Sequence, residues 1–419
     1  MKKIIINIEG SVNSGKSTLL GYLLWKYSTN NRDYIAQKTR LFQIYNKQYK
    51  VPVQEYLANL IQITSDETIR QMTSKSHAVN ITIGDLQLIA IDIGGHNRYT
   101  YQAHLSTVES DTTLFAIPVD EIKEKAYLKN TMLTHLITTY LVRKAFGRTP
   151  EFHVIITKID MEKDYDKYVS QVKSDLNRIC KILGMTDARF YYYTSSIIVK
   201  GINDIQAEGQ YEELLKNLES TVQTRINSSK TVFHARDVMN PTENIKVLAG
   251  RVMSGKIQKN DVLNTPYGEQ KVIQIEEFGQ KIYAADPTSY IAIRFERDNF
   301  PLNFKGGEVL GNFEYFSNGE ITLLDLRDTM KRIQEEFELK DEQYYNPPSK
   351  IQKGTKFYTT INGYRTSLKV EDVISVESKK LRLKVKIEDR VDKISVFGEI
   401  RNTGITYEEN NKIWGAFIL

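Results

Sequence analysis

Short hydrophobic runs alternate with amphipathic stretches along the first half of the chain. In the amphipathic stretches 17–27 and 130–146, apolar residues recur every three or four positions, which is typical of a helix with one buried face. The hydrophobic runs have strand length and are followed by turn residues. This alternation predicts a doubly wound, mostly parallel sheet with helices on both faces. The strands that we expect are 3–8, 86–91, 113–119, 152–156 and 189–193.

The pattern changes after residue 228 to short β-branched runs separated by Gly and Asn turns. Such runs predict β-barrels or sandwiches. Residues 321–339 interrupt them with an amphipathic stretch that predicts a helix, although its last residues could equally open a strand. We therefore expect an α/β domain over 1–228, a β-barrel over 229–316, and a linker helix with a second β-barrel over 317–419.

Composition and charge narrow the class of protein. Cys180 is the one cysteine, which excludes a disulfide within the chain and favours a reducing compartment. The apolar runs are shorter than the roughly 18 residues that a membrane-spanning helix needs. The net charge of +5 permits an anionic partner without requiring one. We expect a soluble, cytoplasmic protein with no membrane partner.

The segment GSVNSGKS at positions 10–17 lies between the first expected strand and the first expected helix. In this context G-x-x-x-x-G-K-S predicts a phosphate-binding loop, because backbone N–H groups turn inward and the helix N-terminus adds positive charge. Lys16 would bridge the β- and γ-phosphates, and Ser17 would hold Mg²⁺. The nucleotide-binding residues expected here are Gly10, Val12, Asn13, Ser14, Gly15, Lys16, Ser17 and Thr18.

Three more motifs, each at the end of an expected strand, indicate which nucleotide binds. The segment 92–95 (DIGG) has the form D-x-x-G, which places a carboxylate near the metal, through water, and a glycine N–H near the γ-phosphate. In 157–160 (TKID) the Asp can accept two hydrogen bonds from guanine, whereas adenine lacks the 2-amino group that this needs. The segment 194–197 (TSSI) offers a backbone N–H to the guanine oxygen. Motifs at the carboxyl ends of neighbouring strands share one edge of the sheet. The four together predict an α/β phosphate-loop GTPase domain that binds GTP and GDP, with further site residues Asp92, Gly95, Thr157, Lys158, Asp160, Ser195, Ser196 and Ile197.

Two segments beside the D-x-x-G motif carry a resemblance to a known family. His96 follows the motif directly, and RQMT at 70–73 places Thr73 19 residues before Asp92. With the four motifs, these segments resemble the translational GTPases of the elongation factor Tu and elongation factor 1-alpha family, and the archaeal and eukaryotic branch more than the bacterial one. The segment 250–257 (GRVMSGKI) is similar to the signature of the family's second domain, and the resemblance is fainter in the third. Departures at Asn13, Gly94 and Thr157 are typical of a divergent member.

The resemblance implies a function, partners and two further site residues. It implies that the chain hydrolyses GTP to deliver aminoacyl-tRNA to the ribosome, with His96 as the catalytic residue beside the attacking water and Thr73 as a ligand of Mg²⁺. It implies tRNA and the ribosome as partners, a guanine-nucleotide exchange factor as a further one, a monomer, and no DNA partner. Two alternatives stay open. One is a release or rescue GTPase that carries a tRNA-mimicking protein, and the other is a non-ribosomal regulatory GTPase module.

Two local patterns each leave two interpretations open. Asn13, where the family usually has Asp, is either a turn residue or a ligand that holds K⁺ against the phosphates. The strictly alternating segment 380–387 (KLRLKVKI) predicts a strand with cations on one face and aliphatic residues on the other. Its cationic face is either a solvated outer surface, with lysines that protect an edge strand, or a stripe that follows RNA phosphates. The residues of that stripe are Lys380, Arg382, Lys384 and Lys386.

Overall fold

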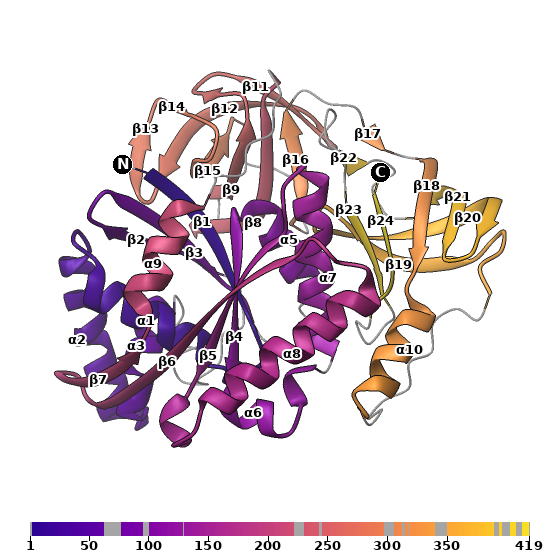
Figure 1. Cartoon of the computed structure of the whole chain (residues 1–419). Helices are drawn as coiled ribbons and strands as arrows, with labels where there is room; N and C mark the ends of the chain where they lie inside the picture. Colours follow the sequence, from indigo (N-terminus) through magenta and orange to yellow (C-terminus); the bar gives the residue numbers. More distant parts are fainter. Residues whose placement is uncertain are drawn as a thin grey trace. The chain divides into compact units, whose positions relative to one another are not determined.

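The computed structural model describes residues 2–62, 77–94, 100–128, 130–221, 230–242, 245–296, 306–311, 315–316, 318–339, 350–388, 394–395, 403–407 and 413–418. The chain divides into two compact units, whose elements are labelled in Figure 1. The α/β unit comprises Met1–Tyr99, Ser110–Leu136 and Thr149–Gln223. The barrel unit comprises Thr100–Glu109, Ile137–Arg148 and Thr224–Leu419.

A seven-stranded sheet forms the centre of the α/β unit. Its strands are β1 (Lys2–Glu9), β2 (His77–Ile83), β3 (Leu86–Asp92), β4 (Thr112–Pro118), β5 (Glu151–Thr157), β6 (Arg189–Gly201) and β7 (Asp204–Gly209). They lie in the order β2-β3-β1-β4-β5-β6-β7. The five inner strands are parallel, whereas the outer strands β2 and β7 pair antiparallel with their neighbours. This order confirms the doubly wound, mostly parallel sheet. Its inner strands β1, β3, β4 and β5 are almost wholly buried, as when helices cover both sides of a sheet.

Helices cover the two faces of this sheet. They are α1 (Lys16–Tyr27), α2 (Arg32–Tyr49), η1 (Val53–Glu55), α3 (Tyr56–Ile61), α6 (Val119–Lys123), η3 (Ala126–Leu128), η4 (Ile159–Met161), α8 (Asp166–Leu183) and α9 (Tyr211–Ser220). Helix α7 (Asn130–Ala145) begins in this unit and continues from Ile137 in the barrel unit. The buried side chains of α1, α3 and α9 pack in one core with Ile4, Ile6 and Ile8 of β1. Helices α6 and α8 pack together on the other side of the sheet (Figure 1). The helices expected over 17–27 and 130–146 are therefore confirmed as α1 and α7.

Six strands of the barrel unit close into a first barrel. They are β8 (Val232–Thr242), β9 (Ile245–Ser254), β11 (Val262–Thr265), β12 (Gly268–Glu277), β15 (Tyr290–Phe295) and β16 (Glu308–Gly311). The ring runs β11-β16-β8-β9-β15-β12 and closes through a β11–β12 pairing. Phe233, Leu248 and Ile291 lie in its core. Short strands outside the ring are β10 (Ile257–Gln258), β13 (Gln280–Ile282) and β14 (Ala284–Ala285).

A second closed barrel follows in the same unit. Its strands are β18 (Asn318–Asp325), β19 (Lys356–Ile361), β20 (Tyr364–Glu377), β21 (Lys380–Ile387), β23 (Thr403–Tyr407) and β24 (Ile413–Ile418). Leu323, Leu368 and Leu383 lie in its core. The two-residue strands β17 (Tyr315–Phe316) and β22 (Ile394–Ser395) pair beside it. Both predicted β-barrels are thus present after the α/β fold.

The helix expected over 321–339 is wrong in its first third. Residues up to Asp325 belong to β18, because Ile321 and Leu323 alternate into the barrel core and the strand pairs with both β21 and β24. The helix that follows, α10 (Arg327–Glu336), buries Thr329, Met330 and Ile333. A strand, with a period of two residues, thus precedes a helix within one apolar-rich stretch. The amphipathic pattern of the stretch as a whole predicts a single helix and does not separate the two elements.

Helix α5 (Thr100–Glu109) belongs to the barrel unit although it lies between strands of the sheet in sequence. It packs against β9 of the first barrel and β20 of the second. Among the residues that the structure describes, no helix is long and apolar enough to cross a membrane.

Candidate nucleotide-binding site

The loop between β1 and α1 has the backbone that a phosphate cradle needs. Gly10 and Gly15 have φ angles of +147° and +84°, and Asn13 has φ of +62°. A Cβ on Gly10 would lie 2.3 Å from the carbonyl oxygen of Ala116, so a larger residue would displace the loop. Asparagine reaches the left-handed region more readily than most residues. The loop therefore turns where the sequence places Gly and Asn.

Lys16 fixes this loop from inside. Its Nζ donates hydrogen bonds to the carbonyl oxygens of Gly10 and Ser11, at 3.0 and 2.6 Å, and to Ser14 Oγ at 3.3 Å. Burial lowers the pKa of Lys16, and the charges of Asp92, Glu121 and Glu9 oppose that shift. A buried ammonium group that is hydrogen-bonded by neutral oxygens binds phosphate oxygens strongly, because the phosphate replaces the interactions with water that burial has removed.

Ser17 and Asp92 join the first two motifs. Ser17 Oγ donates to Asp92 Oδ2 at 2.7 Å. Asp92, the last residue of β3, is 1% exposed. A hydroxyl and a carboxylate are the oxygen donors that Mg²⁺ prefers, so this pair fits the metal that the family implies. Thr73, Gly95 and His96 lie outside the described residues.

The third and fourth motifs meet at the ends of β5 and β6. Thr157 Oγ1 donates to the carbonyl oxygen of Ser14 at 2.7 Å, which ties the guanine motif to the phosphate loop. Ser196 Oγ donates to Asp160 Oδ1 at 2.8 Å. Lys158 has φ of +59°, and its Nζ lies 3.3 Å from Asp120 Oδ2. The Asp160 carboxylate is thus oriented by a serine of the neighbouring strand.

Tyr211 of α9 holds the fourth motif from behind. Its hydroxyl lies 2.8 Å from Ser195 Oγ and donates to the carbonyl oxygen of Ser196 at 2.9 Å. Tyr211 is 3% exposed. These contacts hold Ser195 and Ser196 in the segment 194–197, from which the sequence predicts that one backbone N–H meets the guanine oxygen.

One cavity of about 800 Å³ in the α/β unit joins the four motifs. Of the nucleotide-site residues predicted from sequence, those lining it are Val12, Asn13, Ser14, Gly15, Lys16, Ser17, Thr18, Thr157, Lys158, Asp160, Ser195 and Ile197. The interpretation of Asn13 as a K⁺ ligand stays a prediction. Cavity-lining residues that the sequence analysis missed are Gln54, Glu55, Ala58, Gln62, Ile93, Met161, Ile198, Val199 and Lys200.

Most of the missed residues come from two segments; the exceptions are Ile93 of the D-x-x-G motif and Met161, which follows the guanine motif directly. The first segment is η1–α3, for which no motif gave a signal. The other is the extension of β6, which continues beyond the expected 189–193 to Gly201 and turns back as β7. The β-branched residues Ile197, Ile198 and Val199 were a usable signal for that extension.

The cationic stripe of β21 lies on the second barrel. The strand alternates strictly between exposed cations and buried aliphatic residues. It pairs with β18 and β20 on its two sides. The interpretation of its lysines as protection for an edge strand is therefore wrong. Arg382 Nη2 lies 2.7 Å from Glu320 Oε2, and Lys384 Nζ lies 3.9 Å from Glu371 Oε2, so neighbouring carboxylates balance part of its charge.

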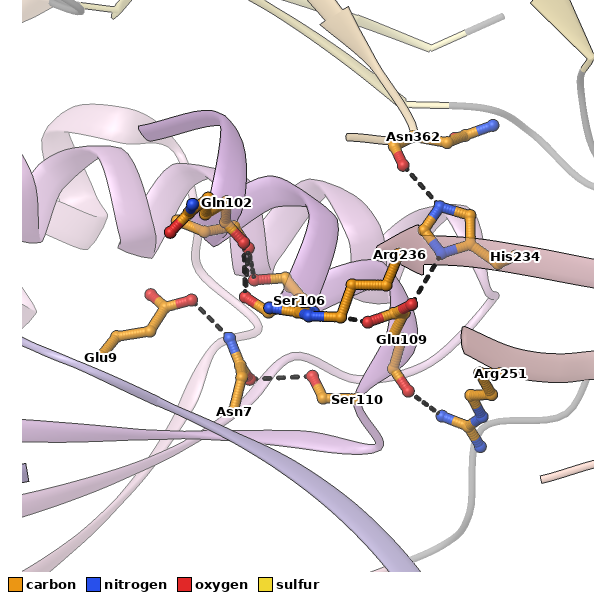
Figure 2. Close-up of polar contacts among 12 residues, drawn as sticks. Asn7, Glu9, Gln102, Ser106, Glu109, Ser110, His234, Arg236, Arg251 and Asn362 are labelled. Atoms are coloured by element: carbon orange, nitrogen blue, oxygen red, sulfur yellow. Dashed lines mark hydrogen bonds and ion pairs between the residues drawn. The ribbon is translucent and has the colours of Figure 1, made fainter. Parts of the chain in front are cut away.

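A buried charge cluster fastens α5 to both barrels, as Figure 2 shows. Glu109 ends α5, and its Oε2 lies 2.5 Å from Nη1 of Arg236, while its Oε1 lies 3.3 Å from Nδ1 of His234. His234 Nε2 donates to the carbonyl oxygen of Asn362 at 2.7 Å, and Arg251 Nη1 donates to the carbonyl oxygen of Glu109. Arg236 and His234 come from β8, and Asn362 from the turn between β19 and β20.

Comparisons with known proteins show which family the chain resembles. A family profile described as "Elongation factor Tu GTP binding domain" matches residues 1–294. An elongation factor 1-alpha of Pyrobaculum aerophilum is 26% identical over 320 residues, which cover 74% of this chain and 69% of that protein.

Two solved structures share the fold. The Saccharomyces cerevisiae Ski7 GTPase-like domain, bound to GTP, has a TM-score of 0.70 at 13% identity and is matched over 97% of its length by all of this chain. The bacterial selenocysteine-specific elongation factor EF-Sec has a TM-score of 0.64 at 15% identity. This chain is covered completely in that match but spans only 58% of EF-Sec.

Proposed function

The chain belongs to the family of the elongation factor Tu GTP binding domain and is a GTPase, and on this premise we propose that it hydrolyses GTP to deliver aminoacyl-tRNA to the ribosome. The proposal places the chain in the cytoplasm as a monomer, with an exchange factor that restores GTP. It assigns to this chain the role in translation elongation that the name of its relative, elongation factor 1-alpha, indicates.

The observation that carries the proposal is the attachment of α5 to both barrels. α5 begins at Thr100, shortly after the D-x-x-G motif, and ends at Glu109, which pairs with Arg236 and His234. A rearrangement of the D-x-x-G segment, whose glycine would sense the γ-phosphate, can therefore be transmitted along the chain to α5, the helix that the barrels hold. Such a route is what a GTP-gated change in the affinity of the barrels for RNA requires.

The residues of the pocket divide the work of hydrolysis. Lys16 and the loop amides bind the β- and γ-phosphates and stabilise negative charge as it develops there. Ser17 and Thr73, with Asp92 through water, would hold Mg²⁺, which would supply further positive charge to the phosphate oxygens. His96 orients the attacking water toward the γ-phosphate, opposite the bond that joins this phosphate to the leaving GDP.

Control of His96 involves two apolar residues. The resemblance to the elongation factors implies that Val12, which is 37% exposed, and Met72, which lies outside the described residues, would keep the imidazole away from the water until the ribosome engages. The resting GTPase is then slow, and hydrolysis follows correct delivery.

A gel-shift experiment with charged tRNA tests the proposal. The GTP-bound protein should bind aminoacyl-tRNA at least about tenfold more tightly than the GDP-bound protein, within the usual range of allosteric coupling. Deacylated tRNA is the matched control and should bind weakly in both states. No binding in either state would contradict aminoacyl-tRNA delivery, and stimulation by ribosomes without tRNA binding would favour the release or rescue alternative.

A further inference from the structure

The four motifs leave the middle of the GTP pocket unassigned. The phosphate loop and Asp92 serve the phosphates, and Lys158, Asp160 and the β6 residues serve the base. The ribose joins these two ends covalently, so it must lie between them. Its 2′- and 3′-hydroxyls are the hydrogen-bond donors of GTP that the four motifs leave without an assigned partner.

The η1–α3 segment spans the same interval. η1 packs against β6, the strand that carries the base-binding residues, and Val53 of η1 and Ile197 of β6 both pack against the same hydrophobic core. α3 packs against α1, the helix that begins at the phosphate loop. This second contact is close, because a Cβ on Gly21 of α1 would lie 1.9 Å from the carbonyl oxygen of Leu57.

Glu55 stands at the junction of these two contacts. It is the last residue of η1 and the N-cap of α3, and it lines the cavity. Its backbone N–H donates to the carbonyl oxygen of Pro52 at 3.0 Å, which fixes the turn. Its side chain is half-buried and makes no hydrogen bond or ion pair with any residue that the structure describes.

The carboxylate of Glu55 is short of favourable partners. Burial raises its pKa, which means that its charged form has lost part of its hydration. A partly buried carboxylate gains most from ligands that donate hydrogen bonds. Phosphate oxygens would repel it, and Asp160 already serves the donor edge of guanine.

We propose that the Glu55 carboxylate accepts hydrogen bonds from the ribose hydroxyls of GTP and makes this GTPase selective for ribonucleotides over deoxyribonucleotides. Nucleotide enzymes of another fold use an Asp or Glu on the ribose in the same chemical way. The inference rests on the pocket binding GTP, as proposed above, and is independent of which RNA or protein is delivered.

A double-mutant cycle between Glu55 and the hydroxyls tests the inference. Affinities for GTP and 2′,3′-dideoxy-GTP are measured by titration calorimetry with wild type and Glu55→Gln. Wild type should bind GTP about tenfold to a hundredfold more tightly than the dideoxy analogue, the range for charge-assisted hydrogen bonds. In Glu55→Gln this preference should fall to about threefold or less, because a neutral amide oxygen is the weaker acceptor.

The dideoxy analogue also checks the fold of the variant, since its affinity should be the same in wild type and Glu55→Gln. Glu124→Gln, at an exposed carboxylate outside the pocket, is the matched control and should keep the wild-type preference. Equal losses for both nucleotides, or a preference that survives Glu55→Gln, would overturn the inference. Failure of wild type to bind either nucleotide would instead contradict the proposed function.

Discussion

Glu109 and Arg236 form a buried ion pair, with 2.5 Å between Oε2 and Nη1, although 126 residues separate them in the sequence. The Glu109 side chain is fully buried and that of Arg236 is 3% exposed. Burial, the largest single influence, lowers the pKa of Arg236, but the carboxylate of Glu109 together with the charges of Tyr290 and Asp237 outweighs burial, so the pKa of Arg236 is raised. The pair makes α5 part of the barrel unit.

Removing Glu109 should destabilise the barrel unit strongly. Glu109→Ala leaves the guanidinium of Arg236 buried without its carboxylate, which costs about 3–5 kcal/mol of unfolding free energy. Urea unfolding followed by circular dichroism measures the loss. Glu335→Ala removes a carboxylate of the exposed Lys331–Glu335 pair and should change the free energy by about 0.5 kcal/mol or less. Similar effects of the two substitutions would mean that the buried pair does not hold α5.

Nucleotide choice should depend on Asp160. Asp160→Asn replaces an acceptor of two guanine hydrogen bonds by a group that also donates, so the affinity for GTP should fall by about tenfold to a hundredfold. Xanthosine triphosphate, which presents an acceptor in place of the amino group, should bind the variant more tightly than GTP does. Competition against a fluorescent nucleotide measures both affinities. Unchanged GTP affinity would remove Asp160 from the base site.

The stability of the barrel unit should fall in mild acid because of His104. Burial, followed by the charge of His234, lowers the pKa of His104 to about 3, and its Nδ1 lies 2.6 Å from Thr360 Oγ1. Since the unfolded chain takes up this proton near pH 6.5, the stabilisation is complete above that pH and is lost as the pH falls toward 3. Between pH 7 and pH 5 the loss should be about 2 kcal/mol.

The variant His104→Gln isolates this contribution. It keeps a polar group beside Thr360 and cannot titrate, so its unfolding free energy should change less between pH 7 and pH 5 than that of wild type. Urea unfolding at both pH values gives the comparison. The same pH dependence in both proteins would show that His104 does not titrate as its burial predicts.

The cationic stripe of β21 should contribute to RNA binding through phosphates. Changing Lys380, Arg382, Lys384 and Lys386 to Gln should flatten the slope of log affinity against log salt by about one unit or more, at unchanged GTP affinity. This change in the salt slope is small for the loss of four cations, because Glu320 and Glu371 already pair with two of them. Changing the exposed Lys331 and Arg332 of α10 to Gln provides the control. A salt slope equal to wild type would leave β21 as solvated surface.

The sequence was most informative where local chemistry repeats. Strands β1, β3, β4 and β5 and the loop before α1 follow from apolar runs that end in turn residues, because the period and the turn chemistry are both local.

The remainder depends on contacts between distant residues. Glu55 joins the pocket only because η1 packs on β6, and nothing around position 55 indicates a ligand site. Glu109 reads as an ordinary helix-end carboxylate until Arg236 and His234 are brought to it. The helix expected over 321–339 is wrong at its start because the strand and the helix adjoin at Asp325, whose carboxylate accepts the N–H of Arg327 and which the amphipathic pattern alone does not mark as a boundary.

The most direct test of the account is GTP turnover by the protein with its aminoacyl-tRNA, measured with and without ribosomes programmed with the matching codon. The account predicts that programmed ribosomes accelerate hydrolysis by the wild type. It also predicts that His96→Ala lowers the stimulated rate by about 10²–10⁴-fold, the scale of a positioned polar catalyst, while GTP affinity stays within a few-fold. Hydrolysis that ribosomes do not accelerate, or an equal loss of GTP binding and turnover in His96→Ala, would contradict it.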